Sequence, residues 1–365
     1  MKRLVKIAPN LRIIEMRSKD ESWRNYRSIG NFTTVPTPTE IEEAKANAPP
    51  DSGDTEKEVD LLADEPVLKR VYLERPDTLR ALSQTCVAYR GVFLPLLFER
   101  LEVCVTTRPG NPTKAFYRHI SETMQRKCSG LAERPDLSEM VAKAHVSFTK
   151  QNADKVLPTF LRCLENLPNL HTIKVVFAPL SMTTTIKNTF EKVSLPTIRT
   201  VVVPAYCHEI LRACPEVRSV WCMEEDGGKL VAALGKGKCG KVEELRGCSL
   251  TPHMMKRLVK IAPNLRIIEI NEGEPDDNLA TLKSFKQLHT IDVARSDATR
   301  KSGATLDPTA PEVAKTIESA RAILKTSPSR EKKYLRLCWK HEKDWLAADR
   351  AYVCVTILVS PAKDR

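Results

Sequence analysis

The sequence has no Cys-x-x-Cys pair, and its 11 cysteines are an odd number. None of its seven histidines stands at a zinc-ligand spacing from another histidine or from a cysteine. We therefore expect neither a metal site nor a disulfide framework, and free thiols favour a reducing compartment, the cytoplasm or the nucleus. Several cysteines at helix or strand positions are expected to pack as small apolar core residues. They are Cys163, Cys207, Cys214 and Cys222.

Signatures of membrane insertion and of catalysis are missing as well. No apolar run approaches the length of a membrane span, and no hydrophobic secretory segment opens the sequence. There is no G-x-S-x-G elbow, and the glycine-rich stretch 224–241 lacks the spacing of a phosphate-binding loop. Its glycines are expected to form turns and to end a helix. These absences predict a protein that is not an enzyme, needs no cofactor and has no membrane partner.

The remaining composition is that of an ordinary globular protein. The 365 residues are 42% hydrophobic and 28% charged, which is enough for a sizeable core and for one or two domains. The net charge is +12, from 58 basic and 46 acidic residues, and the excess is spread along the chain. Because a dispersed excess mainly affects solubility, we expect no nucleic-acid partner.

One short phrase is repeated seven times between about Asp136 and Arg295. It consists of an apolar residue, two variable residues, an apolar residue, one variable residue and a third apolar or small residue. Its first positions lie between 19 residues (198 to 217) and 29 residues (141 to 170) apart. An L-x-x-L-x-L core with a period of about 20–29 residues resembles the leucine-rich repeat. The seven copies are Val141-Ala144-Val146, Leu170-Ile173-Val175, Ile198-Val201-Val203, Val217-Val220-Cys222, Val242-Leu245-Gly247, Leu265-Ile268-Ile270 and Leu288-Ile291-Val293.

The segments between the phrases have apolar residues at helical spacing, as in Val156-Phe160-Leu164. One strand and one helix cannot bury their own apolar faces, whereas stacked units can. The predicted fold is therefore α/β, a leucine-rich-repeat-like solenoid over residues 136–300. Its parallel strands would form the concave face and its helices the convex face.

The residues on either side of this solenoid are expected to connect and to cap it. Residues 102–135 are predicted to be a helical connection. Residues 301–365 are predicted to be a C-terminal cap with one helix, Pro311–Lys325, and two strands, Tyr334–Trp339 and Tyr352–Val359.

Alternate residues of a strand point to opposite faces, so the residues between the phrase positions are expected on the concave face. Trp221 is notable among them, because an exposed indole makes a strong anchor at a protein interface. Alternatively, Trp221 packs beneath a loop of the 19-residue unit. The near end of this face is basic, and the far end, with Glu244, Glu269 and Asp292, is acidic. The residues predicted to bind a protein substrate are Lys174, Val202, Trp221, Met223, Arg246 and Glu269.

The first 60 residues are predicted to be disordered and contain a copied fragment. Met1–Glu15 is identical to Met255–Glu269, which covers the end of one repeat helix and one strand. A recent duplication or a misassembled gene explains such a copy, and docking on an open edge of the solenoid is the functional alternative. Thr33–Glu58 is rich in proline and acidic residues and poor in large apolar residues, as is typical of a disordered linker.

Residues 61–101 are expected to form a small helical segment. Its first helix would begin at the N-cap Asp77 and carry Leu79, Leu82, Cys86 and Tyr89 at helical spacing, and a second short helix would cover Pro95–Leu101. The text DTLRALSQTCVAYRGVFLPLLFERLEV resembles the latter half of an F-box, the helical module that binds the Skp adaptor of cullin-based ubiquitin ligases. The Leu-Pro-x-Glu-apolar helix that opens an F-box is absent here. Alternatively, the segment is a helical cap on the first strand of the solenoid. The residues that would contact the adaptor are Leu79, Leu82, Cys86, Leu96, Leu97 and Phe98.

The whole arrangement resembles the F-box and leucine-rich-repeat proteins of mushroom-forming fungi, over roughly Asp77 to Arg295. This resemblance implies a substrate-recognition subunit of an SCF-type ubiquitin ligase, which binds a Skp-type adaptor and, through it, a cullin. An unknown protein substrate would bind the concave face, and the chain would be a monomer. The alternative is a stand-alone protein-interaction scaffold whose F-box is not functional.

Overall fold

The structure is a computed structural model and describes residues 76–104, 114–223, 227–271, 276–294, 311–340 and 352–359. The chain divides into two units, Met1–Ala63 and Asp64–Arg365, and every described residue belongs to the second. The predicted N-terminal segment 1–60, with its copy of 255–269, lies outside the described residues, and so does most of the sequence before the predicted F-box helices.

The described residues form a ten-stranded sheet in which each strand pairs with the next one along the chain. The first nine strands are parallel, and the tenth is antiparallel to the ninth. The α/β class predicted from the sequence is therefore confirmed, and the topology is compatible with a solenoid. The strands are β1 (Arg100–Val103), β2 (Lys143–Ser147), β3 (Thr172–Phe177), β4 (Thr200–Val203), β5 (Ser219–Cys222), β6 (Glu244–Arg246), β7 (Ile267–Asn271), β8 (Thr290–Ala294), β9 (Lys333–Lys340) and β10 (Tyr352–Val359).

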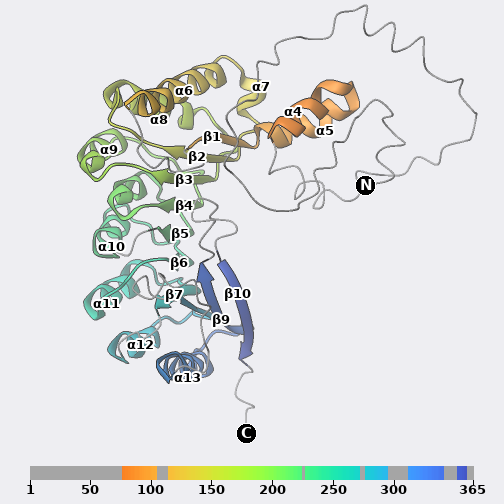
Figure 1. The fold of residues 1–365 in the computed structure, drawn as a ribbon. Coiled ribbons are helices and arrows are strands. Elements are labelled where there is room, and N and C mark those ends of the chain that lie inside the picture. Colours follow the sequence, from red (N-terminus) through yellow and green to blue (C-terminus); the bar gives the residue numbers. More distant parts are fainter. Residues whose placement is uncertain are drawn as a thin grey trace, which may run out of the picture. The chain divides into compact units, whose positions relative to one another are not determined.

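Helices connect the parallel strands, and α6 and α8 to α13 lie along one face of the sheet (Figure 1). The shortest unit, between β4 and β5, uses the 3₁₀-helix η2, whose rise of about 2.0 Å per residue spans the layer with fewer residues. The helices are α4 (Pro76–Thr85), α5 (Val87–Phe98), α6 (Lys114–Ala132), α7 (Pro135–Ser138), α8 (Ala153–Glu165), η1 (Leu180–Met182), α9 (Thr183–Phe190), η2 (Ala205–Ala213), α10 (Gly227–Lys236), α11 (Pro252–Ile261), α12 (Asp276–Leu282) and α13 (Pro311–Thr326).

The core lies between the sheet and these helices and is built from the phrase residues. The first residue of each of the seven phrases is at most 1% exposed. The middle residues form one continuous row across the sheet, in which Ile173, Val201 and Val220 are hydrogen-bonded neighbours and are fully buried. Each such side chain stabilises the fold by roughly 1.5–3 kcal/mol, so the stacked rows carry most of the stability.

Gly247 is the one phrase residue without an apolar side chain. It follows β6 with a φ of +69°, and a Cβ atom there would overlap the carbonyl oxygen of Cys222 on β5. The close approach of these two strands explains why glycine replaces the third apolar residue.

The start of the sheet differs from the prediction. The expected helix over Pro95–Leu101 is confirmed only for its first four residues, which are the end of the longer α5, and it is wrong for Arg100 and Leu101, which belong to β1. β1 pairs in parallel with β2, so the sheet begins before residue 136. The triplet Phe98-Leu101-Val103 has the spacing of the phrase, but the run of apolar residues before it also fits a helix. Burial of Leu101 and Val103 against the core, at 4% exposure each, decides in favour of the strand.

The predictions for the C-terminal residues agree better with the structure. The expected helix over Pro311–Lys325 is confirmed by α13, and both expected strands are present as β9 and β10. They extend the sheet by two strands, so β10 is its last strand.

Candidate protein-binding surfaces

The face of the sheet opposite the helices, here called the polar face, consists of two rows of strand residues. The predicted substrate-binding residues Lys174, Val202 and Trp221 are consecutive neighbours in one of them, here called the central row. Arg246 and Glu269 continue it, and Met223 lies just beyond β5. The five residues in strands therefore share one face of the sheet, as expected from the alternation of side chains, whereas their role in binding a substrate stays a prediction. The central row is Glu102, His145, Lys174, Val202, Trp221, Arg246, Glu269, Asp292, Arg336 and Thr356.

Most of the central row is nevertheless covered in this structure. Lys174 is 2% exposed and Val202 is 6% exposed, whereas Trp221 and Met223 are half-buried. Arg246 and Glu269 are also buried. The surface that a partner could reach around β5 is therefore made by Trp221, Met223 and half-buried residues of the other row of this face, which include Thr200, Ser219 and Glu244.

The far end of the polar face is held by an ion-pair network centred on Asp292, which is fully buried. Arg336 donates two hydrogen bonds to its carboxylate, from Nε to Oδ1 at 2.6 Å and from Nη2 to Oδ2 at 2.9 Å. Arg246 approaches Oδ2 with Nη2 at 3.3 Å and also pairs with Glu244. Burial raises the pKa of Asp292, and the two guanidinium groups oppose that rise. Arg246 and Arg336 thus neutralise most of the acidic charge that the sequence predicts at this end.

Trp221 is a member of the same network. The guanidinium carbon of Arg246 lies 4.7 Å from the centre of the indole ring, which is a cation–π contact. The indole N–H donates to Ser219 Oγ at 3.0 Å, and Ser219 Oγ donates to Glu244 Oε2 at 2.7 Å. One face and the polar atom of the indole therefore make contacts inside the protein, and these contacts orient the ring.

The near end of the polar face gathers cationic side chains around a histidine. Burial lowers the pKa of His145 to about 3, and the neighbouring Arg100, Lys174 and Lys143 add to this effect. His145 is therefore neutral at physiological pH. Lys143 is balanced by Glu99, with Nζ 3.4 Å from Oε1.

The helices α4 and α5 pack on each other and carry the six predicted adaptor-binding residues. Leu79 and Leu82 are buried, at 3% and 8% exposure, so they hold the two helices together. Cys86 is exposed between the helices, where its Sγ accepts a hydrogen bond from the Tyr89 N–H at 3.5 Å. The other three are half-buried: Leu96, Leu97 and Phe98.

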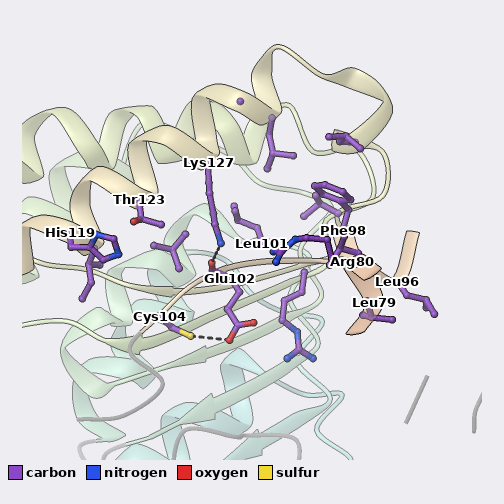
Figure 2. A pocket seen from close by; sticks show the side chains of 18 residues that line it. Leu79, Arg80, Leu96, Phe98, Leu101, Glu102, Cys104, His119, Thr123 and Lys127 are labelled. Atoms are coloured by element: carbon purple, nitrogen blue, oxygen red, sulfur yellow. Dashed lines mark hydrogen bonds between the residues drawn. The ribbon is translucent and has the colours of Figure 1, made fainter. Parts of the chain in front are cut away.

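Leu79, Leu96, Leu97 and Phe98 line a cavity of about 630 Å³ together with β1 and α6. Leu101 of β1 also lines this cavity, and its polar lining residues include Arg80 and His119. In Figure 2, Lys127 reaches from α6 toward β1, where its Nζ donates to the Glu102 carbonyl oxygen at 2.6 Å. Burial lowers the pKa of Lys127.

Cys104 closes one side of this cavity. Its Sγ donates to Glu102 Oε1 at 3.4 Å, and burial, followed by the negative charge of Glu102, raises the pKa of the thiol to about 12. The thiol therefore stays protonated and is a poor nucleophile. The cavity is lined mainly by apolar side chains, and its lining comes from the helical pair, the first strand and α6.

Two features of these surfaces are not predicted from the sequence. Val87, at the first position of α5, is 88% exposed, although no periodic pattern marks it as a surface residue. Arg336 completes the Asp292 network from a strand 44 residues away. The register of β9 against β8 could have placed it, because Asp292 and Arg336 are direct neighbours.

Among the described residues, no three His, Cys, Asp or Glu side chains are grouped so that they could hold a metal ion. No helix in the described part of the chain has both the length and the hydropathy to cross a bilayer. None of the ten cysteines whose side chains the structure describes, from Cys86 to Cys338, forms a disulfide. Comparison with the models of known protein families and with curated proteins finds no match to this chain.

Proposed function

We propose that this chain is a protein-recognition scaffold of the leucine-rich-repeat type, and that it acts as the substrate-recognition subunit of a cullin-type ubiquitin ligase. The adaptor would bind the helical pair α4–α5, and a protein substrate would bind the polar face near β5. The chain would perform no chemistry itself, and would raise the effective concentration of substrate near the ligase.

The observation that carries this proposal is the placement of the helical pair. α5 runs directly into β1, so a partner held by α4–α5 has a fixed position relative to the strands. Val87, Leu96 and Leu97 give the pair an apolar surface that is exposed or half-buried. A surface of this kind is better suited to bind a helical protein partner than to bind a small polar ligand.

The placement of the substrate near β5 is supported by Trp221. It is aromatic and half-buried, and Arg246 and Ser219 hold it in one orientation. Rigid aromatic side chains lose little conformational freedom on binding, so they dominate interface energies.

Binding of the adaptor is tested by a pull-down of the full chain with a purified Skp-type adaptor. We expect stoichiometric capture by the natural sequence and a loss of capture in Leu97→Asp, which places a charge on the half-buried apolar surface. Leu82 is a poor choice for this test, because a charge at that buried position would disrupt the helical pair itself.

Leu180→Asp is the matched control for this experiment. Leu180 lies in η1 and is 66% exposed, so the same substitution should leave both folding and capture unchanged. If the natural chain is folded by circular dichroism but captures no adaptor, the adaptor role is refuted.

A second candidate is a stand-alone interaction scaffold, in which α4–α5 only caps the sheet. It is favoured by the cavity, because Leu79 of α4 lines it beside Leu101 and Val141 at the start of the sheet. A capping role predicts that removing residues 1–99 exposes β1 and destabilises the remaining chain. A dispensable docking module would leave the melting temperature of that chain unchanged.

A further inference from the structure

The two outermost strands of the sheet are very different. β1 has four residues, and its Arg100 and Glu102 are charged. β10 has eight residues, YVCVTILV, without a charge, a proline or a glycine. Proteins protect the edges of sheets with short strands, charged side chains, prolines or bulges, because an open edge pairs with other strands. β1 has two of these protections and β10 has none.

The core holds β10 in a regular conformation. All eight of its residues are in continuous register with β9, without a bulge. Val359 is 4% exposed in the core, and Ile357 packs against it. On the other side of the strand, Thr356 is exposed and Leu358 is 59% exposed. Among the described residues, β10 pairs on one side only, with β9. Its other edge is thus eight residues long, regular and uncharged.

We propose that β10 is a dimerisation strand that pairs antiparallel, edge to edge, with β10 of a second copy of this chain. Two identical strands are complementary in length and composition when they pair antiparallel about a two-fold axis, and such a contact closes at two copies. The half-buried Ile357 and the exposed Leu358 of each copy would be covered by the same strand of the other. This proposal replaces the monomer expected from the sequence, and it does not depend on the adaptor.

The axis of such a dimer is perpendicular to the joined sheet, so equivalent residues of the two copies lie on the same face. Near the middle of the strand they come within reach of each other, and like charges there repel. Thr356 is the position of choice for a substitution, because it is central and exposed.

The first measurement is the mass of the full chain by light scattering or sedimentation over a range of concentrations. We expect a species of about 82 kDa, twice the 41.1 kDa of the chain, which dissociates on dilution. A mass of 41.1 kDa at every concentration would overturn the proposal, and so would an open polymer.

The second measurement repeats this with Thr356→Lys and Thr356→Glu. Each variant alone should dimerise about tenfold or more weakly, and a mixture of the two should dimerise again because opposite charges meet. At concentrations where the natural chain is itself monomeric, both variants should melt at the same temperature as the natural chain, since Thr356 is exposed. Where the natural chain is dimeric, loss of the dimer should lower the melting temperature. Leu180→Lys, on an exposed site of η1, is the control and should dimerise normally. A Thr356→Lys variant that dimerises as well as the natural chain would overturn the proposal.

A pair of proline variants tests the edge itself. In an antiparallel strand, successive N–H groups point alternately to the two sides, so Val355→Pro and Thr356→Pro each remove one N–H, on opposite sides of β10. The proline on the outer side should abolish the dimer while the monomer keeps its melting temperature, as prolines on edge strands do. The proline on the β9 side should destabilise the monomer. If both variants still dimerise, the edge is not the interface.

Discussion

The two faces of this sheet are built from alternate residues of the same strands, yet they are held together differently. The face toward the helices is a set of apolar rows, buried in all seven phrases except at Gly247. The polar face is joined by specific pairs, such as Arg336 with Asp292 and Arg246 with Trp221. The apolar rows tolerate any side chain of suitable volume, whereas each pair needs its own partner at its own distance.

This difference separates the source of the protein's stability from the source of its specific contacts. The free energy gained from apolar burial is nearly additive along the rows. Each strand–helix unit therefore contributes to stability in proportion to the apolar area that it buries. A buried ion pair contributes little net stability when intact, but leaves an uncompensated charge when one partner is removed. Substitutions on the two faces separate these two behaviours, and their expected effects on stability differ widely.

The largest effect is expected at Asp292. Asp292→Ala removes the carboxylate that faces Arg246 and Arg336 and should lower the free energy of unfolding by about 3–5 kcal/mol, because both guanidinium groups lose a counter-charge. Equilibrium denaturation by urea measures it.

A matched control is available on the surface. Arg134 and Asp136 form the same two-bond pair, at 2.9 and 2.7 Å, but their side chains are 55% and 56% exposed. Asp136→Ala should leave the urea midpoint unchanged, since water screens the pair. Equal effects at the two sites would mean that burial does not control the contribution of these pairs.

Adjacent isoleucines on β7 compare the two faces directly. Ile268 is fully buried in the apolar rows, whereas Ile267 lies on the polar face and is half-buried. Ile268→Ala should cost about 2–5 kcal/mol and Ile267→Ala less than about 1.5 kcal/mol. The two variants have the same change of volume in the same strand, so a similar loss in both would contradict the assignment of the core to one face.

The sequence is enough to predict the apolar face and not enough to predict the polar face. The phrase residues recur at a strand spacing, and burial follows from that spacing because one face of each strand must be covered. β1 is missed because Leu96 to Val103 is apolar at both helical and strand spacing, and only packing against β2 selects the strand. The partner of Asp292 is missed because β9 lies beyond a 38-residue connection, which sets no register by itself.

The pH dependence of stability should be carried by His145. Burial, and then the neighbouring cations, lower its pKa in the folded protein from 6.5 to about 3. The unfolded chain therefore binds more protons between these values, and stability should be fully present above about pH 6.5 and fall as the pH drops toward 3. The contribution of His145 to this slope is at most about 1.4 kcal/mol per pH unit.

His145→Gln removes the titrating group and keeps a polar side chain at that position. Urea denaturation at several pH values between 7.5 and 4.5 should give a shallower dependence for this variant than for the natural chain. An unchanged slope would show that other groups carry the acid sensitivity, and that the basic end of the polar face is not a determinant of it.

The smallest effect is expected at Trp221, where structure and recognition meet. Trp221→Phe keeps an aromatic ring but loses the N–H bond to Ser219 and weakens the contact with Arg246, so it should cost only about 0.5–1.5 kcal/mol. Ser219→Ala removes the acceptor, and the double variant should cost less than the sum of the two, because they share one bond. Additive costs would mean that the indole N–H contributes nothing to the fold.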